Sequence, residues 1–403
     1  MTISVITTFR AESSTSVLED SDRLLDLFGT VVDRDASDLH LRAAIPPVMR
    51  IDGALVPLDL PPLSGDEVEG VLNSLCSPEQ KSIFDRDKDI DFAIEVPGLM
   101  RFRVNALRQQ GTVSLAFRAI PFQVPSIDSL GLPQVCKTLA LRRRGLILVT
   151  GPTGSGKSTT LAAMIEHMNL NCGRNVVTIE DPIEYVHHSK KCIIAQRNLG
   201  DDATSFCSAV VHALRHDADV IAIGEIRDLD TMNAAITAAE TGHLVLGTLH
   251  TIDAVRSVDR IVDLYPADQR AEVRLRLSQV IEAILSQTLL PRIDGGRVPA
   301  FEIMVANGAI RDLIREERTA ELPRNMELSS KEEGMHTLDQ GLADLVARGI
   351  VTKEEALARS SNPTRLQTLL FNLQPLSQGA PDTVSPCRES APVEKLPRYA
   401  RWK

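Results

Sequence analysis

Paired cysteines, aromatic residues and excess positive charge are scarce in this sequence, and each shortage argues against a class of protein. The absence of a C-x-x-C pair argues against a structural zinc site and against a disulfide framework, so we expect a cytoplasmic protein. Aromatic residues make up 3% of the chain and the net charge is −10, so we expect no nucleic-acid partner. The six scattered cysteines are Cys76, Cys136, Cys172, Cys192, Cys207 and Cys387.

Long apolar runs are also missing. The longest ones are far shorter than the roughly 18 residues that a membrane-spanning helix needs. The first residues lack the basic stretch and apolar core that mark a secretory signal. A chain of 403 residues, with 43% hydrophobic and 24% charged residues, is typical of a soluble protein with two or three domains.

The first half of the chain predicts a small α+β domain at residues 21–122, after a flexible leader at residues 1–20. Residues 24–32 have helical spacing, and a capping box at Ser64 and Glu67 predicts a helix that runs to about Phe84. Asp52-Gly53 is a hairpin signal between two strands. The strand-like runs are residues 38–41, 48–51, 54–56, 90–96, 101–106 and 112–118.

A linker at residues 123–133 precedes a larger α/β domain at residues 134–373. Its strand candidates alternate with helical stretches, which predicts a mostly parallel sheet with helices on both faces. Residues 270–290 have helical spacing, and helical patterns continue to about Leu373. Residues 374–403 are rich in proline and serine and predict a disordered tail. The strand candidates are residues 145–150, 175–179, 220–223 and 243–249.

A phosphate-binding loop lies between the first of these strands and a helix-forming segment. The glycines allow backbone N–H groups to surround phosphates, and the following helix N-terminus attracts their charge. Lys157 is expected to neutralise the β/γ-phosphates and Ser158 to bind Mg²⁺, so ATP and Mg²⁺ are the predicted cofactors. The loop is Gly151-Pro152-Thr153-Gly154-Ser155-Gly156-Lys157-Ser158-Thr159.

Two acidic segments follow later strands of the same domain. Glu180, Asp181 and Glu184 come within five residues at the end of one strand. Each alone is more simply a solvated loop acid, but the cluster in this context indicates a place at the nucleotide. The run that ends in Gly224 and Glu225 resembles the second Walker pattern, with glycine at the first position of the usual acid pair. Glu225 is therefore the remaining acid able to hold Mg²⁺, through water.

Histidines bracket another strand, with His243 before it and His250 after it. A lone histidine is usually structural. Two histidines at the ends of a buried strand in a nucleotide-binding fold favour a role in orienting the γ-phosphate or neighbouring loops over a role in proton transfer.

In this order and context, these motifs resemble those of the type IV pilus retraction ATPases, within the wider superfamily of secretion and pilus motor ATPases. The similarity covers residues 24–370 and includes Ala36-Ser-Asp-Leu-His-Leu41 and Ala309-Ile-Arg-Asp-Leu-Ile-Arg315. Its central motifs are the phosphate loop, Thr178-Ile-Glu-Asp-Pro-Ile-Glu-Tyr-Val-His187, Gly224-Glu-Ile-Arg-Asp228 and Thr237-Ala-Ala-Glu-Thr-Gly-His-Leu-Val-Leu-Gly-Thr-Leu-His250.

The resemblance implies a homohexameric ring whose subunits have a PAS-like N-terminal domain and a RecA-like P-loop ATPase domain. It implies that Glu184 polarises the attacking water, that Glu225 supports the metal, and that His243 and His250 form a histidine box. Arg227, in the same motif as Glu225, is a further candidate catalytic residue. Arginines from a neighbouring subunit's first domain would complete the site, and the sequence does not choose among Arg101, Arg103, Arg108 and Arg118.

The resemblance also implies a cellular role, with alternatives left open. It implies a motor that powers pilus retraction and twitching motility, peripherally associated with the inner membrane through a pilus platform protein. The lack of a C-x-x-C pair and the short N-terminal region favour retraction over the type II secretion and pilus assembly ATPases. An accessory retraction ATPase, acting beside a paralogue, is an alternative within the group. A RecA-like DNA-translocating ATPase is an alternative of another class, disfavoured by the acidic composition.

Overall fold

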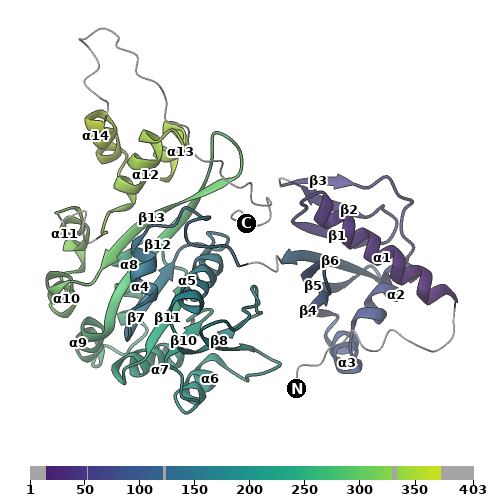
Figure 1. Ribbon diagram of the computed structural model, residues 1–403, viewed down its shortest axis with the longest axis horizontal. Coiled ribbons are helices and arrows are strands. Elements are labelled where there is room, and N and C mark those ends of the chain that lie inside the picture. The colour runs from purple at the N-terminus through teal and green to yellow at the C-terminus, as the bar shows by residue number, and fades with distance from the viewer. Residues whose placement is uncertain (1–14, 52, 121–123, 329–333, 374–403) are drawn as a thin grey trace, which may run out of the picture. The chain divides into compact units, whose positions relative to one another are not determined.

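The computed structural model describes residues 15–51, 53–120, 124–328 and 334–373. The chain divides into two compact units, Met1–Phe122 and Gln123–Lys403. Figure 1 shows both units. Most of the expected leader and all of the expected tail lie outside the described residues. Within the described residues, no helix combines the length and apolar character needed to cross a membrane.

The first unit contains a six-stranded antiparallel sheet in the order β3-β2-β1-β6-β5-β4. Alternating residues point to one face, where Phe102 and Phe117 pack against Phe28 of α1 with ring centroids 4.3 and 5.3 Å away. All six strands predicted from the sequence are present. They are β1 (Asp38–Arg42), β2 (Val48–Ile51), β3 (Ala54–Pro57), β4 (Asp89–Val96), β5 (Met100–Gln109) and β6 (Thr112–Ile120).

The helices of this unit differ from the prediction in two places. Helix α1 (Thr15–Asp33) begins well before the apolar pattern that predicted it. The single helix expected up to Phe84 is two helices, α2 (Gly65–Leu75) and α3 (Pro78–Asp87). Ser77 is extended and its side chain accepts a bond from the Gln80 N–H, so it caps a new helix with Pro78 in its first turn. The proline that ends one helix therefore starts the next.

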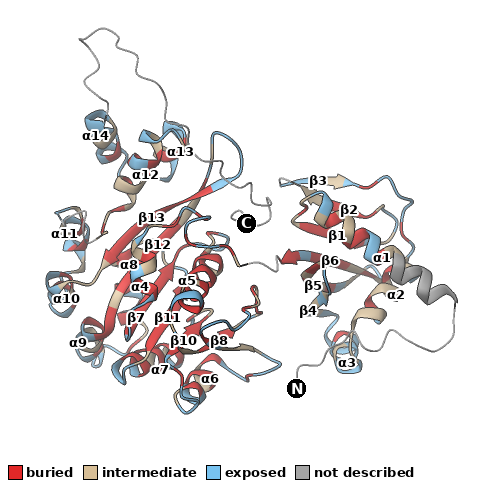
Figure 2. Cartoon of the chain, in the orientation of Figure 1, coloured by how far each residue is buried: buried red, intermediate tan, exposed pale blue. Residues whose placement is uncertain are grey.

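The second unit contains a seven-stranded sheet in the order β13-β12-β7-β11-β10-β8-β9. It is parallel except for the β12–β13 pair, as the alternating pattern predicts. Its central strands are buried on both faces (Figure 2). The strands are β7 (Gly145–Thr150), β8 (Asn175–Glu180), β9 (Ile193–Asn198), β10 (Val220–Ile223), β11 (Leu244–Leu249), β12 (Ile281–Pro291) and β13 (Arg297–Val305).

Helices cover both faces of this sheet and continue beyond β13 (Figure 1). Helix α4 (Val135–Ala140) precedes the first strand. The helices between the strands are α5 (Lys157–Asn171), α6 (Phe206–Ala213), α7 (Leu229–Glu240), α8 (Ala254–Asp263) and α9 (Arg270–Val280). After β13 come α10 (Gly308–Arg315), a 3-10 turn (Thr319–Glu321), α11 (Leu322–Leu328), α12 (Leu338–Ala347), α13 (Lys353–Arg359) and α14 (Pro363–Leu373).

The helix expected over residues 270–290 is wrong in its second half. Helix α9 ends at Val280, and the next residues form β12, which pairs with both β7 and β13. Most side chains of β12 are buried, so its sequence lacks the alternation that marks a half-exposed strand. The continuous helical pattern expected up to Leu373 is likewise interrupted by β13. As a result, β12 lies directly beside the strand that leads into the phosphate loop.

Candidate active site

The phosphate loop connects the end of β7 to the start of α5, as the sequence predicts. Gly151 has φ of 144°, and a Cβ there would lie 2.3 Å from the Gln287 carbonyl oxygen. Gly154 and Gly156 have φ of 78° and 88°, in the left-handed region that favours glycine. The loop path therefore depends on glycine at all three positions.

Lys157 is buried at the centre of this loop. Its Nζ donates to the carbonyl oxygens of Gly151 at 2.9 Å and Pro152 at 3.1 Å. Burial lowers the pKa of Lys157, while the charges of Glu225 and Glu184 act in the opposite direction. The charges of two carboxylates from separate motifs therefore act on the lysine.

The hydroxyl groups of the loop are suitable hydrogen-bond partners for a phosphate and suitable ligands for a hard cation. Ser155 Oγ is buried with no hydrogen-bond partner, although buried hydroxyls normally have one. Ser158 lies half-buried in the first turn of α5. Among the described residues, no three histidine, cysteine or acidic side chains gather as a metal site. This donor set suits Mg²⁺, which is usually held by few protein groups together with phosphate and water.

Strand β12 supports the loop through residues that sequence reasoning missed. Gln287 donates to the Ser155 carbonyl oxygen and accepts a 2.8 Å bond from Thr160. Ser286 accepts a 2.9 Å bond from Thr150 at the end of β7. Two polar residues in an otherwise apolar segment were the signal that the sequence offered for this role. The helix expected over residues 270–290 did not place them beside the phosphate loop.

Glu225 connects three polar groups near Lys157. Its carboxylate lies 2.9 Å from His250 Nε2 and accepts a 2.7 Å bond from Arg227. That Arg227 bond and the nearby positive charges lower the pKa of Glu225. His250 Nδ1 in turn lies 3.4 Å from Thr153 Oγ1 in the phosphate loop. The chain of contacts links the phosphate loop to the end of β10.

The glycine that replaces the usual acid before Glu225 has a steric cause. A Cβ on Gly224 would lie 3.1 Å from the Ile179 carbonyl oxygen and 3.2 Å from Glu180 Cα. Its N–H donates to the same carbonyl oxygen at 2.8 Å. A side chain at this position would therefore make tight contacts with the backbone of β8.

The loop that carries Glu184 is held in place by Gln196 of β9. Gln196 accepts a 2.7 Å bond from the His187 N–H and donates a 2.8 Å bond to the Tyr185 carbonyl oxygen. It also donates to Glu180, whose pKa is raised by burial. The expected acid cluster is therefore divided, because Glu180 is occupied inside the protein while Glu184 acts on Lys157.

Helix α5 anchors the same loop from the other side. Thr159 Oγ1 lies 3.2 Å from the Tyr185 hydroxyl. Glu166 pairs with Lys190, and its Oε2 lies 3.6 Å from His187 Nδ1. One helix thus carries the phosphate-binding lysine and fixes the position of the loop with the candidate catalytic acid.

The two bracketing histidines lie at opposite ends of strand β11. Strand β11 pairs in register with β7, so His243 lies beside the start of β7 and His250 beside its end. The separation is about 23 Å at about 3.3 Å per residue. His243 Nδ1 lies 3.0 Å from the Ala238 carbonyl oxygen, near the end of α7. Of the two histidines, the structure places only His250 beside the phosphate loop of its own chain, and the role expected for His243 stays a prediction.

Three of the four candidate arginines share one face of the six-stranded sheet. Arg103 and Arg118 are cross-strand partners, and Arg101 precedes Arg103 by two residues on β5. Arg118 lies 3.0 Å from Asp38 and Arg103 lies 3.6 Å from Asp91. Arg101 Nε is buried with no hydrogen-bond partner.

Arg108 lies on the opposite face of that sheet, among the helices. Its guanidinium bonds Glu69 of α2 at 2.8 Å and lies 5.5 Å from the centre of the Phe84 ring of α3. These contacts give Arg108 a structural role within its own unit. Strand alternation therefore separates it from the other three candidates.

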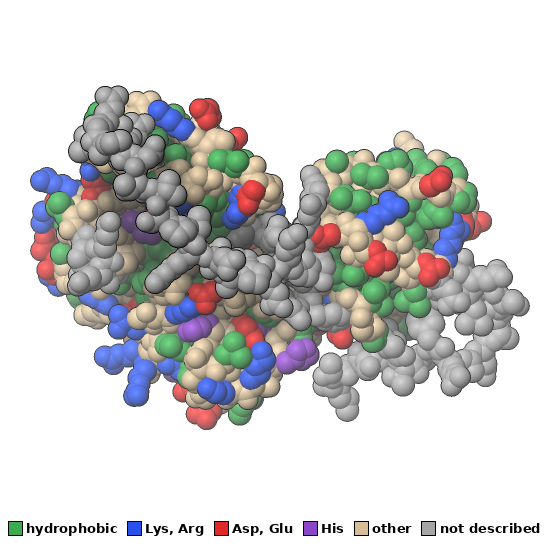
Figure 3. All heavy atoms as spheres, turned by 45° about the horizontal axis from the view of Figure 1, so that its top comes forward, with side chains coloured by type: hydrophobic (Ala, Val, Ile, Leu, Met, Phe, Trp, Pro, Cys, Tyr) green, Lys and Arg blue, Asp and Glu red, His purple; other side chains and the backbone are tan. Residues whose placement is uncertain are grey.

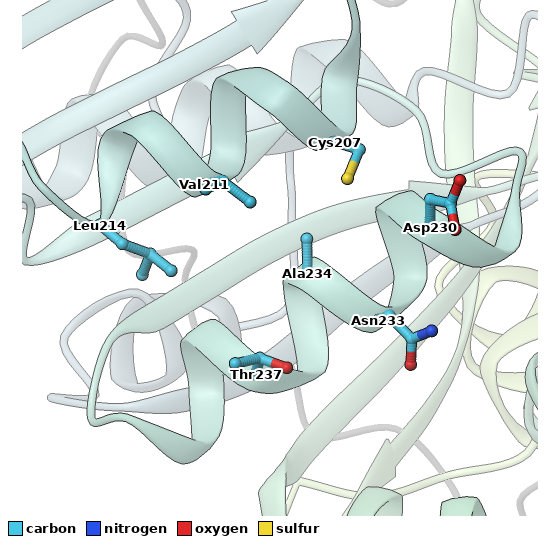
Figure 4. A pocket seen from close by; sticks show the side chains of 7 residues that line it. All are labelled: Cys207, Val211, Leu214, Asp230, Asn233, Ala234 and Thr237. Carbon is cyan, nitrogen blue, oxygen red and sulfur yellow. The ribbon is translucent and has the colours of Figure 1, made fainter.

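A groove between α6 and α7 is separate from the phosphate loop (Figure 4). Its volume is about 290 Å³. None of the residues that line it belongs to the phosphate loop or to the acidic motifs. They are Cys207, Val211, Leu214, Asp230, Asn233, Ala234 and Thr237.

Comparisons with known proteins show the family of this chain. The family described as "Type II/IV secretion system protein" matches residues 21–358. The chain is 45% identical over 340 residues to the type IV pilus retraction ATPase PilT of Pseudomonas aeruginosa, covering 84% of this chain and 98% of that protein. It is 39% identical over 345 residues to the type IV pilus ATPase PilU of the same organism, covering 85% and 90%.

A solved structure leads to the same group. The crystal structure of the pilus retraction motor PilT with bound ADP matches with a TM-score of 0.81 and 44% identity, covering 86% of this chain and 99% of that one. The chain therefore belongs to the type II/IV secretion system protein family and, within it, to the type IV pilus retraction ATPases.

Proposed function

We propose that this chain is the Mg²⁺-dependent ATPase subunit of a homohexameric ring that powers type IV pilus retraction. The observation that carries the proposal is the chain of contacts that runs from Glu225 through His250 to Thr153 in the phosphate loop. A phosphate loop alone binds nucleotide, whereas a nearby carboxylate able to orient water makes hydrolysis feasible.

Each residue then has a chemical role. Lys157 and the backbone N–H groups of the loop hold the β/γ-phosphates, and Glu184 orients and polarises the attacking water. Ser158 would hold Mg²⁺ directly and Glu225 through water, because both Glu225 oxygens already have protein partners. When bound, Mg²⁺ neutralises the negative charge that develops on the phosphates. His250 and Arg227 keep the Glu225 carboxylate oriented.

A neighbouring subunit completes the site in this proposal. The first unit takes the PAS-like role, and its face with Arg101, Arg103 and Arg118 supplies the positive charge that stabilises phosphoryl transfer. The partly satisfied state of these arginines supports this role, since Arg101 Nε has no partner and Arg103 lies 3.6 Å from its acid.

The cellular role follows from the relatives. We assign the chain to the principal motor, acting at the inner membrane on a pilus platform protein, because identity to PilT is 45% against 39% for PilU. A role in type II secretion is less supported, since the type II secretion system protein E of Xanthomonas campestris is 33% identical over 46% of its own length.

Two variants test the chemistry. Lys157→Ala is expected to abolish ATP hydrolysis. Glu184→Gln is expected to bind a fluorescent ATP analogue normally and to hydrolyse ATP at least about 100-fold more slowly. Hydrolysis unchanged by both substitutions would contradict the site.

Two further measurements test the role. A deletion strain that still retracts its pili would exclude the principal motor and leave the accessory one. Strong stimulation of hydrolysis by DNA would instead favour a DNA translocase. On the face shown in Figure 3, acidic and basic side chains are interspersed on the smaller unit, which gives that alternative no support.

A further inference from the structure

Cys172 and Cys192 bring two thiols together beside the phosphate-loop helix. Cys172 is the C-cap of α5, and Cys192 immediately precedes β9. The Cys192 thiol donates a 3.0 Å bond to the Cys172 carbonyl oxygen. Cys172 also contributes to raising the pKa of Cys192.

Backbone bonds on either side fix this contact. The Lys191 N–H donates to the Asn169 carbonyl oxygen at 3.0 Å, and the Ile193 N–H donates to the Arg174 carbonyl oxygen at 2.9 Å. The residues flanking Cys192 are thus tied to the residues flanking Cys172. The proximity of the thiols is built into the β8–β9 pairing rather than into the rotamer of one side chain.

The two thiols differ in access. Cys192 is 2% exposed and its pKa is raised by burial, whereas Cys172 is partly exposed. Cys76 and Cys136 are placed differently, since burial raises their pKa to about 11 and about 12 and no second thiol acts on them. An oxidant would therefore meet Cys172 first, with Cys192 next to it to resolve the product.

We propose that Cys172 and Cys192 form a reversible disulfide when hydrogen peroxide reaches the protein. The Cys172 sulfur attacks one oxygen of the peroxide and the O–O bond breaks. The other oxygen leaves as water with the proton that the thiol has lost, and Cys172 becomes a sulfenic acid. The Cys192 sulfur then attacks that sulfur, an S–S bond forms, the S–O bond breaks, and its oxygen leaves as a second water with the Cys192 proton. Two thiols lose two electrons in total, and hydrogen peroxide is reduced to two waters.

This disulfide would regulate the ATPase through the loop that carries Glu184. The bond joins the end of α5 to the end of the segment that runs from Glu184 to Cys192. To form it, the Cys192 sulfur leaves the Cys172 carbonyl oxygen, and the adjoining Lys190, which pairs with Glu166 of α5, shifts with it. Oxidation is therefore expected to lower turnover several-fold and to leave nucleotide binding largely intact.

The test uses the purified full chain, treated with hydrogen peroxide and then with dithiothreitol. We expect peroxide to remove two free thiols, to produce one peptide pair that joins Cys172 to Cys192, and to lower turnover until dithiothreitol restores it. Cys172→Ser and Cys192→Ser each remove the response. Cys207→Ser is the matched control, because Cys207 is half-buried in the groove between α6 and α7, where no other lining residue is a cysteine.

Two outcomes would overturn the proposal. If the thiol count stays unchanged, or peroxide links other cysteines, the pair is not a redox site. If the disulfide forms while turnover is unchanged, its regulatory role is wrong. Melting curves of each serine variant show that loss of response is not loss of fold, and either variant alone suffices for the comparison.

Discussion

At the scale of single residues, the site depends on a position where the backbone of a neighbouring strand restricts the side chain. Gly224 is enclosed by backbone atoms of β8, which cannot move aside as a flexible side chain would. This explains why the pattern around Glu225 departs from the usual pair of acids. The same close approach aligns the ends of β8 and β10, from which the loops with Glu184 and Glu225 leave.

We therefore predict that Gly224→Ala lowers the free energy of unfolding by about 1–3 kcal/mol and reduces turnover. Gly224→Asp, which restores the usual acid, is expected to be worse. Denaturant unfolding and ATPase assays measure both effects. Gly308→Ala is the control, because a Cβ on Gly308 meets nothing within 4 Å. A fully active Gly224→Asp variant would show that the steric account is wrong.

Glu166 is a second residue with a measurable consequence. Burial acts to raise its pKa, but contacts with His187, Lys190 and Asn169 outweigh burial and bring it to about 2. A carboxyl with a lowered pKa stabilises the fold above its unfolded value of 4.5, and this contribution disappears as pH falls towards 2.

Glu166→Gln is expected to lower the free energy of unfolding by about 2 kcal/mol at neutral pH. The difference from the natural chain should shrink as pH drops from 4.5 towards 2. Urea denaturation across this range measures it, with the exposed Glu272→Gln as control. A difference that stays constant with pH would exclude the ionised Glu166 as its cause.

At the scale of elements, strand β12 matters as much to the nucleotide as the loop itself. It pairs with β7 and places Gln287 where it bonds both the loop, at Ser155, and the first turns of α5, at Thr160. Because Gln287 is almost fully buried, both bonds are shielded from water. The loop is thereby held open for phosphate before any nucleotide arrives.

Gln287→Ala should weaken nucleotide binding about 30-fold, since two hydrogen bonds of about 1 kcal/mol each are lost. Titration with a fluorescent ATP analogue measures the affinity. Gln279→Ala, on the exposed side of the neighbouring helix α9, is the control and should bind normally. Equal affinity in the two variants would show that Gln287 of β12 does not support nucleotide binding.

At the scale of the whole molecule, the proposed ring predicts that two defective subunits can rescue each other. Lys157→Ala lacks its own phosphate site, and the Arg103→Ala/Arg118→Ala double variant lacks the arginines proposed for its neighbour's site. Each should be inactive alone. Mixed and reassembled, they should regain a measurable fraction of turnover, because some sites combine intact parts.

The matched control for this mixing experiment is Arg108→Ala. Arg108 lies on the opposite face of the same sheet, so its loss should lower stability through Glu69 and Phe84 without removing activity from a neighbour. If the double variant is fully active alone, the arginine face does not complete a neighbouring site.

Local sequence by itself determined the phosphate loop, the four strands first predicted around it, and the antiparallel strands of the first unit. Each of these depends on short-range chemistry: glycine where φ is positive, alternation where one face of a strand is buried, and a cap where a helix starts. The loop sequence also predicted Lys157, and the acidic segments together with the family resemblance predicted Glu184 and Glu225.

Only the tertiary structure decided what depends on neighbours in space. Strand β12 looked helical because a segment buried on both faces loses its alternation, and its pairing with β7 and β13 fixed it as a strand. The sequence predicted similar roles for His243 and His250, but the length of β11 places them at opposite ends of that strand. Arg108 separated from Arg103 because alternate residues of one strand face opposite ways, and only packing decides which face the helices cover.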